Sequence, residues 1–457
     1  MDSIPAKDTL SDLKPILGRD FEFIIQNSQS IIQNFPMPQT KPTSTVTVEN
    51  IAKAARVLEG VATRTPLMFN PQLSEKIGAD VWLKREDLQM VRSYKIRGAY
   101  HKIQSLTDDE LINGIVCASA GNHAQGVAFA CNKKEIKGTI FMPSPTPAQK
   151  VKQVKMFGKQ YVDVILAGDT FDDAFEEAIE FCSQQKAAFI PPFDDHKIIE
   201  GQGTVGKEIL EDIEKPIDYL IVPIGGGGLA AGIGSYFKAL SPSTKIIGVE
   251  PEGAPAMKKS LEKGQIITLK KIDKFVDGAA VKKVGKFTFE ICKEVLEKVI
   301  TVPEGKICST ILQLYNEQAI VVEPAGALSV AALDSLKDEL EGKNVVCVLS
   351  GSNNDITRMA EIKERSLLYE GLKHYFIIDF PQRAGALREF LNDVLAPEND
   401  ISHFEYSRKT TREQGPALIG IEIESREDFE PLIKRMEVKN IQYEYVNNQP
   451  HLFRFLI

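Results

Sequence analysis

The stretch DYLIVPIGGGGLAAGIG (residues 218–234) joins one apolar run to a second through four consecutive glycines. A short apolar run followed by a glycine turn and a helical pattern is typical of a strand–helix unit in an α/β protein. Further runs of this kind alternate with segments rich in Ala, Glu and Lys, such as 169–186. They lie at 114–119, 138–143, 161–166, 245–250 and 344–350. Continuous apolar strands between amphipathic helices indicate parallel sheets covered on both faces, so we expect an α/β fold with two lobes for residues 46–365.

The pattern changes near the C-terminus, where we expect a smaller domain at 370–457. Residues 373–395 predict a strand, a turn and a helix, and 417–425 alternate strictly as a strand does. A helix is predicted next, at 426–440, and the apolar run 450–457 predicts a closing strand. A β-α-β-β-α-β order is typical of a ferredoxin-like α+β domain.

The composition is that of an ordinary globular protein with a formal net charge of −8, and no lysine- or arginine-rich run resembles a nucleic-acid-binding footprint. No apolar stretch of about 18 residues predicts a membrane-spanning helix, and the acidic first residues do not resemble a secretory signal, so we expect a cytoplasmic protein. The six cysteines are scattered, which favours reduced thiols over a metal site. Residues 1–45 end in a segment rich in proline and threonine and predict an N-terminal extension and linker.

The glycine turn at 225–228 is the first candidate site. Because it has no side chains, its backbone can approach an anion closely, and the first amides of the helix that begins near Leu229 would point at that anion. The same region also fits a looser dinucleotide-binding pattern, GxGxxA at 226–231, and Glu250 ends the next strand where a ribose-binding acid would lie. A tight structural turn, a phosphate cradle and the cofactor site of a dinucleotide-dependent oxidoreductase therefore all remain open.

Two further loops follow predicted strands, where ligands bind in α/β sheets. In 118–130 the backbone amides could hold a carboxylate and the Asn122 side chain could bind a ring oxygen. His123 in the same loop could act as a general base or could pack on the helix. In 349–355 the hydroxyl group of Ser350 stands at a strand end, where it could also belong to a helix N-cap.

Lys95 lies in VRSYKIRGAY (91–100), which by itself also fits a solvated surface lysine. A lysine amine is a good nucleophile only when neutral, which requires desolvation or nearby positive charge. Arg92 and Arg97 could supply that charge, although for Arg97 a structural role is favoured over a catalytic one. A phosphorylated aldehyde cofactor would use a lysine, a phosphate cradle, a carboxylate-binding loop and a strand-end serine together. This combination favours Lys95 as a nucleophile over a solvated surface lysine.

Several motifs occur in a fixed order: TRTPL (63–67), WLKREDLQ (82–89), SYKIRGA (93–99), SAGNHAQGVA (119–128), GGGGL (225–229), VEPAGA (322–327) and LSGSNND (349–355). Together they resemble the pyridoxal-phosphate enzymes of the tryptophan-synthase-β type and, within these, the biosynthetic threonine dehydratases (threonine ammonia-lyases). The resemblance covers about residues 46–365. It implies the two-lobed fold of that type, pyridoxal 5'-phosphate as cofactor, L-threonine as substrate with L-serine as a second candidate, and a homodimer or homotetramer.

The resemblance also implies a role for each matching residue. Lys95 would be the Schiff-base lysine and would remove the α-proton, while Tyr94 would flank the cofactor ring. Asn122 would bind the ring oxygen, and Ser350 would face the pyridine nitrogen. The phosphate would be held by Gly225, Gly226, Gly227, Gly228 and Leu229, and the substrate carboxylate by Ser119, Ala120, Gly121, Asn122 and His123, with the amides of Ser119, Gly121 and Asn122 as the clamp.

The C-terminal motif FPQRAGALREFL (380–391) resembles the start of the ACT-like regulatory domain of the same dehydratases. It implies feedback inhibition by isoleucine with valine as antagonist, and the alternative is an oligomerisation module without a ligand. Three other functions stay open for the chain: a serine dehydratase or racemase-like enzyme, a dinucleotide-dependent oxidoreductase, and a non-catalytic amino-acid sensor. In the similar serine racemases the position of Ala120 is a serine, so we expect poor racemisation. The residues around Glu250 give no clear set of metal ligands, and we expect no metal.

Overall fold

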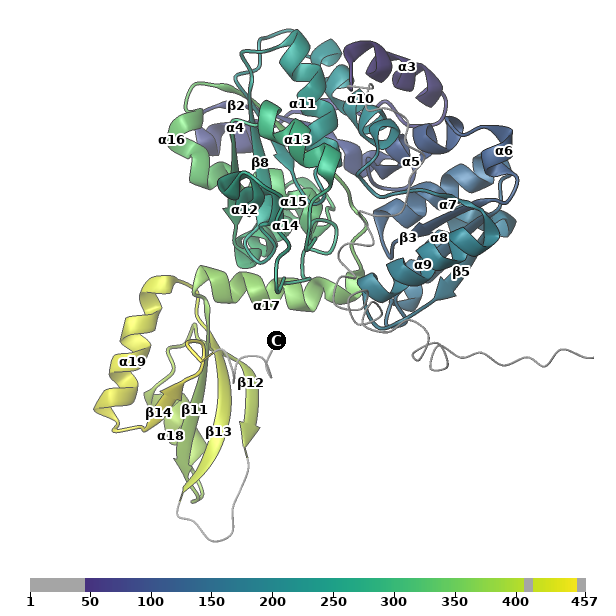
Figure 1. The fold of residues 1–457 in the computed structure, drawn as a ribbon. Helices are drawn as coiled ribbons and strands as arrows, with labels where there is room; N and C mark the ends of the chain where they lie inside the picture. Colours follow the sequence, from purple (N-terminus) through teal and green to yellow (C-terminus); the bar gives the residue numbers. More distant parts are fainter. Residues whose placement is uncertain (1–45, 407–413, 450–457) are drawn as a thin grey trace, which may run out of the picture. The chain divides into compact units, whose positions relative to one another are not determined.

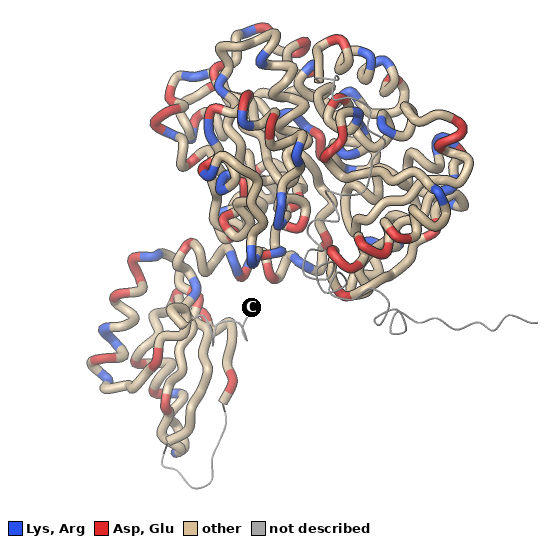
Figure 2. Tube along the Cα trace, in the orientation of Figure 1, with Lys and Arg blue, Asp and Glu red and all other residues tan. Residues whose placement is uncertain are grey.

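The alternating part of the sequence folds around two largely parallel sheets, and an antiparallel sheet follows it (Figure 1). The structure is a computed structural model, and it describes residues 46–406 and 414–449. The predicted extension at 1–45 and the predicted closing strand at 450–457 lie outside the described residues. Figure 2 shows acidic and basic residues interspersed along the described chain, in agreement with the mixed charge pattern of the sequence.

The larger parallel sheet carries most of the core. Its strands are β1 (Leu67–Phe69), β2 (Asp80–Arg85), β7 (Tyr219–Pro223), β8 (Lys245–Pro251), β9 (Lys298–Val302) and β10 (Asn344–Leu349). They lie in the order β1-β2-β10-β7-β8-β9, and all neighbours are parallel except β1 and β2. The strands predicted at 218–224, 245–250 and 344–350 are therefore confirmed.

Successive residues of β10 point to opposite faces of the sheet, and each face has its own apolar core. Val345, Cys347 and Leu349 belong to one buried cluster. Val346 and Val348 belong to another. Because side chains alternate along a strand, a strand covered on both faces needs an uninterrupted apolar run. This explains why the central strands lack the polar alternation of an exposed strand.

The smaller parallel sheet is built from the chain between β2 and β7, which makes the second lobe. Its strands are β3 (Ile115–Ala118), β4 (Gly138–Met142), β5 (Val162–Leu166) and β6 (Ala188–Phe189), in the order β5-β4-β3-β6. All its neighbouring strands are parallel. The strands predicted at 114–119, 138–143 and 161–166 are confirmed, as is the division into two lobes.

Helices connect the parallel strands, and local capping sets where several of them begin. They are α3 (Val48–Leu58), α4 (Pro71–Ile77), α5 (Lys95–Gln104), α6 (Asp108–Leu111), α7 (Asn122–Lys134), α8 (Ala148–Gly158), α9 (Phe171–Gln185), α10 (His196–Asp212), α11 (Gly228–Leu240), α12 (Ala256–Lys263), α13 (Lys286–Val295), α14 (Glu304–Gln318), α15 (Pro324–Ala331), α16 (Lys337–Leu340) and α17 (Met359–Glu370), with short 3₁₀ turns η2 (Glu86–Leu88), η3 (Lys159–Tyr161), η4 (Leu333–Leu336) and η5 (Ile356–Arg358). In α9, predicted at 169–186, Thr170 and Asp173 form a reciprocal capping box. None of the described helices is long and apolar enough to cross a membrane.

The antiparallel sheet has a β-α-β-β-α-β order, as predicted, but its last described strand lies at 443–445, before the closing strand predicted at 450–457. Its elements are β11 (Lys373–Pro381), α18 (Ala386–Asp393), β12 (Asp400–Tyr406), β13 (Gln414–Glu422), η6 (Arg426–Asp428), α19 (Phe429–Val438) and β14 (Tyr443–Tyr445). The strand order β12-β13-β11-β14, with every neighbour antiparallel, is ferredoxin-like. The edge strand β12 is largely exposed and has no apolar run to predict it.

Candidate active site

Lys95 is the first residue of α5, and its side chain is half-buried. Its Nζ atom donates a hydrogen bond to the carbonyl oxygen of Pro192 at 2.8 Å and lies 5.4 Å from the centre of the Tyr94 ring. Burial lowers the pKa of the Lys95 amine to about 8, while Glu323 acts in the opposite direction. A useful fraction of the amine is therefore neutral near physiological pH, as a nucleophile or base requires.

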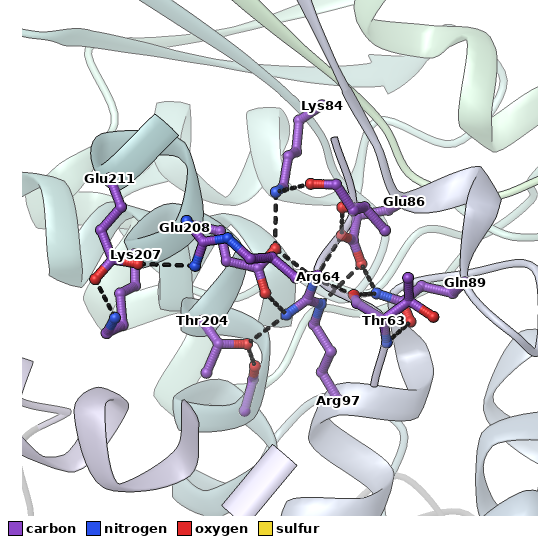
Figure 3. Close-up of polar contacts among 12 residues, drawn as sticks. Thr63, Arg64, Lys84, Glu86, Gln89, Arg97, Thr204, Lys207, Glu208 and Glu211 are labelled. Carbon is purple, nitrogen blue, oxygen red and sulfur yellow. Dashed lines mark hydrogen bonds and ion pairs between the residues drawn. The ribbon is translucent and has the colours of Figure 1, made fainter. Parts of the chain in front are cut away.

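Arginine charge does not activate Lys95, and Arg97 has the structural role that the sequence favoured for it. Arg92 is exposed. The guanidinium group of Arg97 is buried and forms ion pairs of 2.7 Å with both Glu86 and Glu208 (Figure 3). Since these carboxylates neutralise Arg97, desolvation is the main cause of the lowered pKa of Lys95.

The Arg97 network instead anchors the helix that carries Lys95. Arg97 lies on α5, Glu86 follows β2, and Glu208 lies on α10, which packs against α5. The buried Nζ atom of Lys84 joins the same network by donating to Glu208 at 2.7 Å. These contacts hold the start of α5, and thus Lys95, against two other elements (Figure 3).

The loop between β3 and α7 has backbone amides that could bind a carboxylate, but they are not all the ones that were expected. The amide of Ser119 donates to the carbonyl oxygen of Phe141 at 3.0 Å, so the prediction that it clamps a carboxylate is wrong. The amide of Gly121 donates to the hydroxyl oxygen of Ser119 at 3.2 Å. Within the described residues, no acceptor faces the amides of Ala120, Asn122 and His123. These amides, at the start of α7, are therefore free to donate to an anion.

His123 is buried and tied to the backbone. Its Nε2 atom lies 2.9 Å from the carbonyl oxygen of Ile190, so this nitrogen must carry the hydrogen. Burial, with a further contribution from Lys95, lowers the pKa of the imidazole to about 3. These contacts favour the packing role over the general base.

The backbone of the glycine turn packs so closely against neighbouring residues that a side chain would displace them. Gly227 has a φ of +94° and caps α11, a conformation that favours glycine. A Cβ atom on Gly226 would lie 2.2 Å from the ring of Phe193. No protein acceptor in the described chain faces the amides of Gly228 and Leu229. The turn is thus a close-approach surface at a helix N-terminus, suited to phosphate.

The contacts of Glu250 argue against a dinucleotide-binding site at this turn. The Glu250 carboxylate is fully buried and accepts hydrogen bonds from the amides of Met257 at 2.7 Å and Lys258 at 2.8 Å. It therefore caps the start of α12 and is not free to bind a ribose hydroxyl. Among the described residues no group of three His, Cys, Asp or Glu side chains is placed to hold a metal ion.

Ser350 lies beside Lys95 at the end of β10. Its backbone oxygen accepts from the amide of Tyr94 at 3.2 Å, and its buried hydroxyl donates to the carbonyl oxygen of Ala325 at 3.3 Å. The predicted residues therefore come together from the carboxyl ends of β3, β7 and β10 and from the start of α5. Two surface depressions, lined by 75–78 with 337–341 and by 68–72 with 318–320, lie elsewhere.

The sequence assigned no role to three residues that the structure places in this cluster. Glu323 is buried, and its Oε1 atom accepts from Nδ2 of Asn122 at 2.6 Å. Asn353 donates to Oδ1 of Asn122 at 2.5 Å, and the ring of Phe193 covers the glycine turn. Glu323 stands in the motif VEPAGA, but a glutamate before a proline also fits a helix start. Phe193 lies outside all the motifs.

Comparisons with known proteins show the family of the chain. The family model described as pyridoxal-phosphate dependent enzyme matches residues 58–351, and the one described as C-terminal regulatory domain of threonine dehydratase matches 364–456. Biosynthetic L-threonine dehydratase IlvA of Halalkalibacterium halodurans is 60% identical over 90% of this chain and 99% of its own length. Its namesake in Bacillus subtilis is 56% identical over 92% of this chain and 100% of its own. The structure of the processed form of threonine deaminase isoform 2 from Solanum lycopersicum superposes with a TM-score of 0.66 at 38% identity, over 71% of this chain and 96% of the other.

Proposed function

The chain belongs to the family of pyridoxal-phosphate dependent enzymes, and on that premise we propose that it deaminates L-threonine to 2-oxobutanoate and ammonia, the first step of isoleucine biosynthesis. The observation that carries the proposal is Lys95, a half-buried lysine with a lowered pKa, in one cluster with a glycine cradle and an anion-binding loop. The relatives named biosynthetic L-threonine dehydratase match nearly the whole chain outside the N-terminal extension.

The residues present fit pyridoxal phosphate. The turn at 225–228 has no room for a Cβ at Gly226 and leaves helix amides without protein acceptors, as a phosphate cradle requires. Lys95 supplies the amine for a covalent link to the aldehyde. Asn122 supplies an amide for the ring oxygen, and Ser350 supplies a neutral hydroxyl for the pyridine nitrogen. When bound, the cofactor would supply an aldehyde for the amine and an electron sink for the α-carbon of the substrate.

The chain's own residues then perform the proton transfer and the positioning. The amides at the start of α7 bind the substrate carboxylate, which orients the α-hydrogen relative to the cofactor plane. Lys95, with a pKa of about 8, takes that proton, because burial keeps part of the amine neutral. The neutral Ser350 hydroxyl cannot hold a proton on the ring as a carboxylate would. This favours rapid loss of the β-hydroxyl group over a long-lived carbanion.

Ala120 cannot donate a proton at the opposite face of the cofactor, as racemisation would require. Ala120 has a methyl group where a racemase has a hydroxyl, so we expect deamination to be much faster than interconversion of L- and D-serine. Serine is expected as a second, poorer substrate, since a single methyl group contributes only about 1–3 kcal/mol to discrimination in a pocket.

Regulation is proposed for the C-terminal domain. Its match to a regulatory domain of threonine dehydratase supports feedback control, and we propose isoleucine as the inhibitor. We also propose that the protein is a homodimer or homotetramer. Because its relatives are named as biosynthetic enzymes, we propose that it is a cytoplasmic protein. The proposed units are a two-lobed catalytic domain at 46–365 and a regulatory domain at 370–457.

Lys95→Ala tests the catalytic proposal. We expect the purified wild type to form 2-oxobutanoate from threonine and to show a visible cofactor band that borohydride changes. Lys95→Ala should lose both turnover and the borohydride-sensitive band, while Lys155→Ala, at an exposed lysine, should keep them. Deamination that persists in Lys95→Ala would exclude Lys95 as the base and the covalent anchor.

A further inference from the structure

A chain of side-chain amides leads from the backbone next to Lys95 to the buried carboxyl group of Glu323. Asn353 uses its Nδ2 atom twice, donating to the carbonyl oxygen of Val91 at 2.9 Å and to Oδ1 of Asn122 at 2.5 Å. Asn122 in turn donates from its own Nδ2 to Oε1 of Glu323 at 2.6 Å. This series of hydrogen bonds therefore joins four separate parts of the sequence at the point where the cofactor ring is expected.

The chemistry of these groups allows only one direction for the chain. The backbone carbonyl of Val91 can only accept, so it must face the NH₂ group of Asn353. That NH₂ group has a second hydrogen, and this fixes the oxygen of the Asn122 amide toward Asn353. The NH₂ group of Asn122 must then face Glu323. One of its two hydrogens goes to the carboxyl oxygen, and the other is the only donor left on this side chain.

Glu323 is held firmly in its place at the end of this chain. It is 5% exposed and precedes α15, but its side chain makes no capping hydrogen bond. A Cβ atom on Gly351, the residue after Ser350, would lie 2.5 Å from Oε1 of Glu323. The carboxyl group thus lies between the asparagine proposed for the ring oxygen and the strand end proposed for the ring nitrogen.

We propose that Glu323 and Asn353 are positioning residues for the reaction: together they hold the Asn122 amide in one orientation and leave its second N–H group as the donor to the cofactor ring. This inference rests on the proposed function and adds to it two residues that act through Asn122. Without Asn353, the Asn122 amide could turn by 180° and present its oxygen to the ring oxygen, which would repel it.

The charge of Glu323 adds a pH dependence to this role. Burial raises the pKa of its carboxyl group to about 7, and the neighbouring Asp277 acts in the same direction. Lys150 and the Asn122 hydrogen bond act in the opposite direction, and Lys95 and Tyr94 on the α5 side also feel its charge. Below this pH the neutral carboxyl group accepts the Asn122 hydrogen bond more weakly than the carboxylate does above it.

Asn353→Ala, compared with Asn354→Ala, tests the orientation. Asn354 is the next residue, also half-buried, and among the described residues its side-chain amide donates a hydrogen bond only to the sulfur of Met359. Titration of each apoenzyme with pyridoxal phosphate should show roughly tenfold weaker binding for Asn353→Ala, the size of one lost hydrogen bond, and wild-type binding for Asn354→Ala. Equal binding by wild type and Asn353→Ala, or an equal loss in both variants, would overturn the proposal.

Glu323→Gln tests the charge. In the wild-type holoenzyme we expect an inflection near pH 7 in the visible cofactor spectrum and in kcat/KM, from the Glu323 carboxyl group. Glu323→Gln should lose this inflection and Glu323→Asp should keep one. An unchanged pH profile in Glu323→Gln contradicts the role of the charge. If Glu323→Gln does not fold, Asn353→Ala still tests the orientation of Asn122, because it leaves the Glu323 carboxyl group in place. Cofactor binding and threonine turnover by the wild type report separately on the proposed function.

Discussion

Arg97 is the largest fully buried side chain of the described residues, and its two carboxylate partners make it costly to remove. Arg97→Met would leave Glu86 and Glu208 without their partner, and breaking a buried pair from one side typically costs about 3–5 kcal/mol. We expect a loss of this size in the free energy of unfolding, measured by urea denaturation of the holoenzyme. Arg64→Met is the matched control in the same region, because the Arg64 side chain is 53% exposed and its ion pairs are worth at most about 1 kcal/mol. Similar losses in both variants would show that the Arg97 network is not specially stabilising.

The same network predicts an acid dependence of stability. Burial alone would raise the pKa of Glu86, but Arg97 and Lys84 outweigh it and hold the pKa below its ordinary value of 4.5. A carboxyl group whose pKa is lower in the folded state contributes stability above its unfolded pKa and loses it as the pH falls through its folded pKa. Wild-type stability should therefore fall below about pH 4.5, and Arg97→Met should show a shallower fall. A parallel decline in both proteins would contradict this account.

At the scale of single residues, the sequence predicted some features of the candidate site and missed others. The motifs for phosphate and carboxylate binding predicted that Lys95 lies near the glycine turn, and both contact the segment at Pro192 and Phe193. The sequence favoured a structural role for Arg97 but could not name its two carboxylate partners, since they lie 11 residues before it and 111 residues after it. Glu323 and Asn353 were missed for the same reason: their importance comes from contacts with Asn122, which lies more than 200 residues away.

At the scale of elements, the turn before α11 needs a glycine at position 227, because the backbone there has a positive φ. Gly227→Ala would force a φ of +94° on a residue with a Cβ atom and place that atom 2.8 Å from Met257. We expect at least roughly tenfold weaker binding of pyridoxal phosphate, since a shift of about 1.4 kcal/mol suffices for this. Gly60→Ala has a comparable backbone strain at φ +69° but meets no atom within 4 Å, so it should lower stability without changing cofactor affinity. Titration of both apoenzymes separates the two effects, and equal cofactor affinity in both variants would rule out the cradle.

Whether an element could be predicted depended on how deeply it is buried. The central parallel strands have apolar side chains on both faces, and a continuous apolar run predicts such a strand without knowledge of its partners. β12 has exposed residues along most of its length and takes its shape from pairing with β13, so its sequence carries no comparable signal. β6 has only two residues, which is too short for any periodic pattern.

At the scale of the whole chain, α17 is the last helix of the catalytic part and decides where the regulatory domain can be removed. The guanidinium group of Arg365 lies 4.4 Å from the ring centre of the buried Phe275, and the hydroxyl of Ser366 lies 3.0 Å from that of Ser309 on α14. The ion pair between Glu364 and Lys373 then joins this helix to β11. Most of the contacts of α17 are therefore with the catalytic part, although its sequence leads into the regulatory domain.

A chain that ends after residue 371 should keep threonine turnover and lose its response to isoleucine, because it keeps α17 on α14 and removes the whole antiparallel sheet. A chain that ends after residue 358 loses α17 and should be much less stable, since Phe275 and α14 would be exposed to water. The measurement is 2-oxobutanoate formation with and without isoleucine, beside the thermal midpoint of each holoenzyme. Isoleucine inhibition that survives the cut after 371 would place the effector site in the catalytic part. Loss of turnover with unchanged thermal stability would instead show that the antiparallel sheet itself takes part in the reaction.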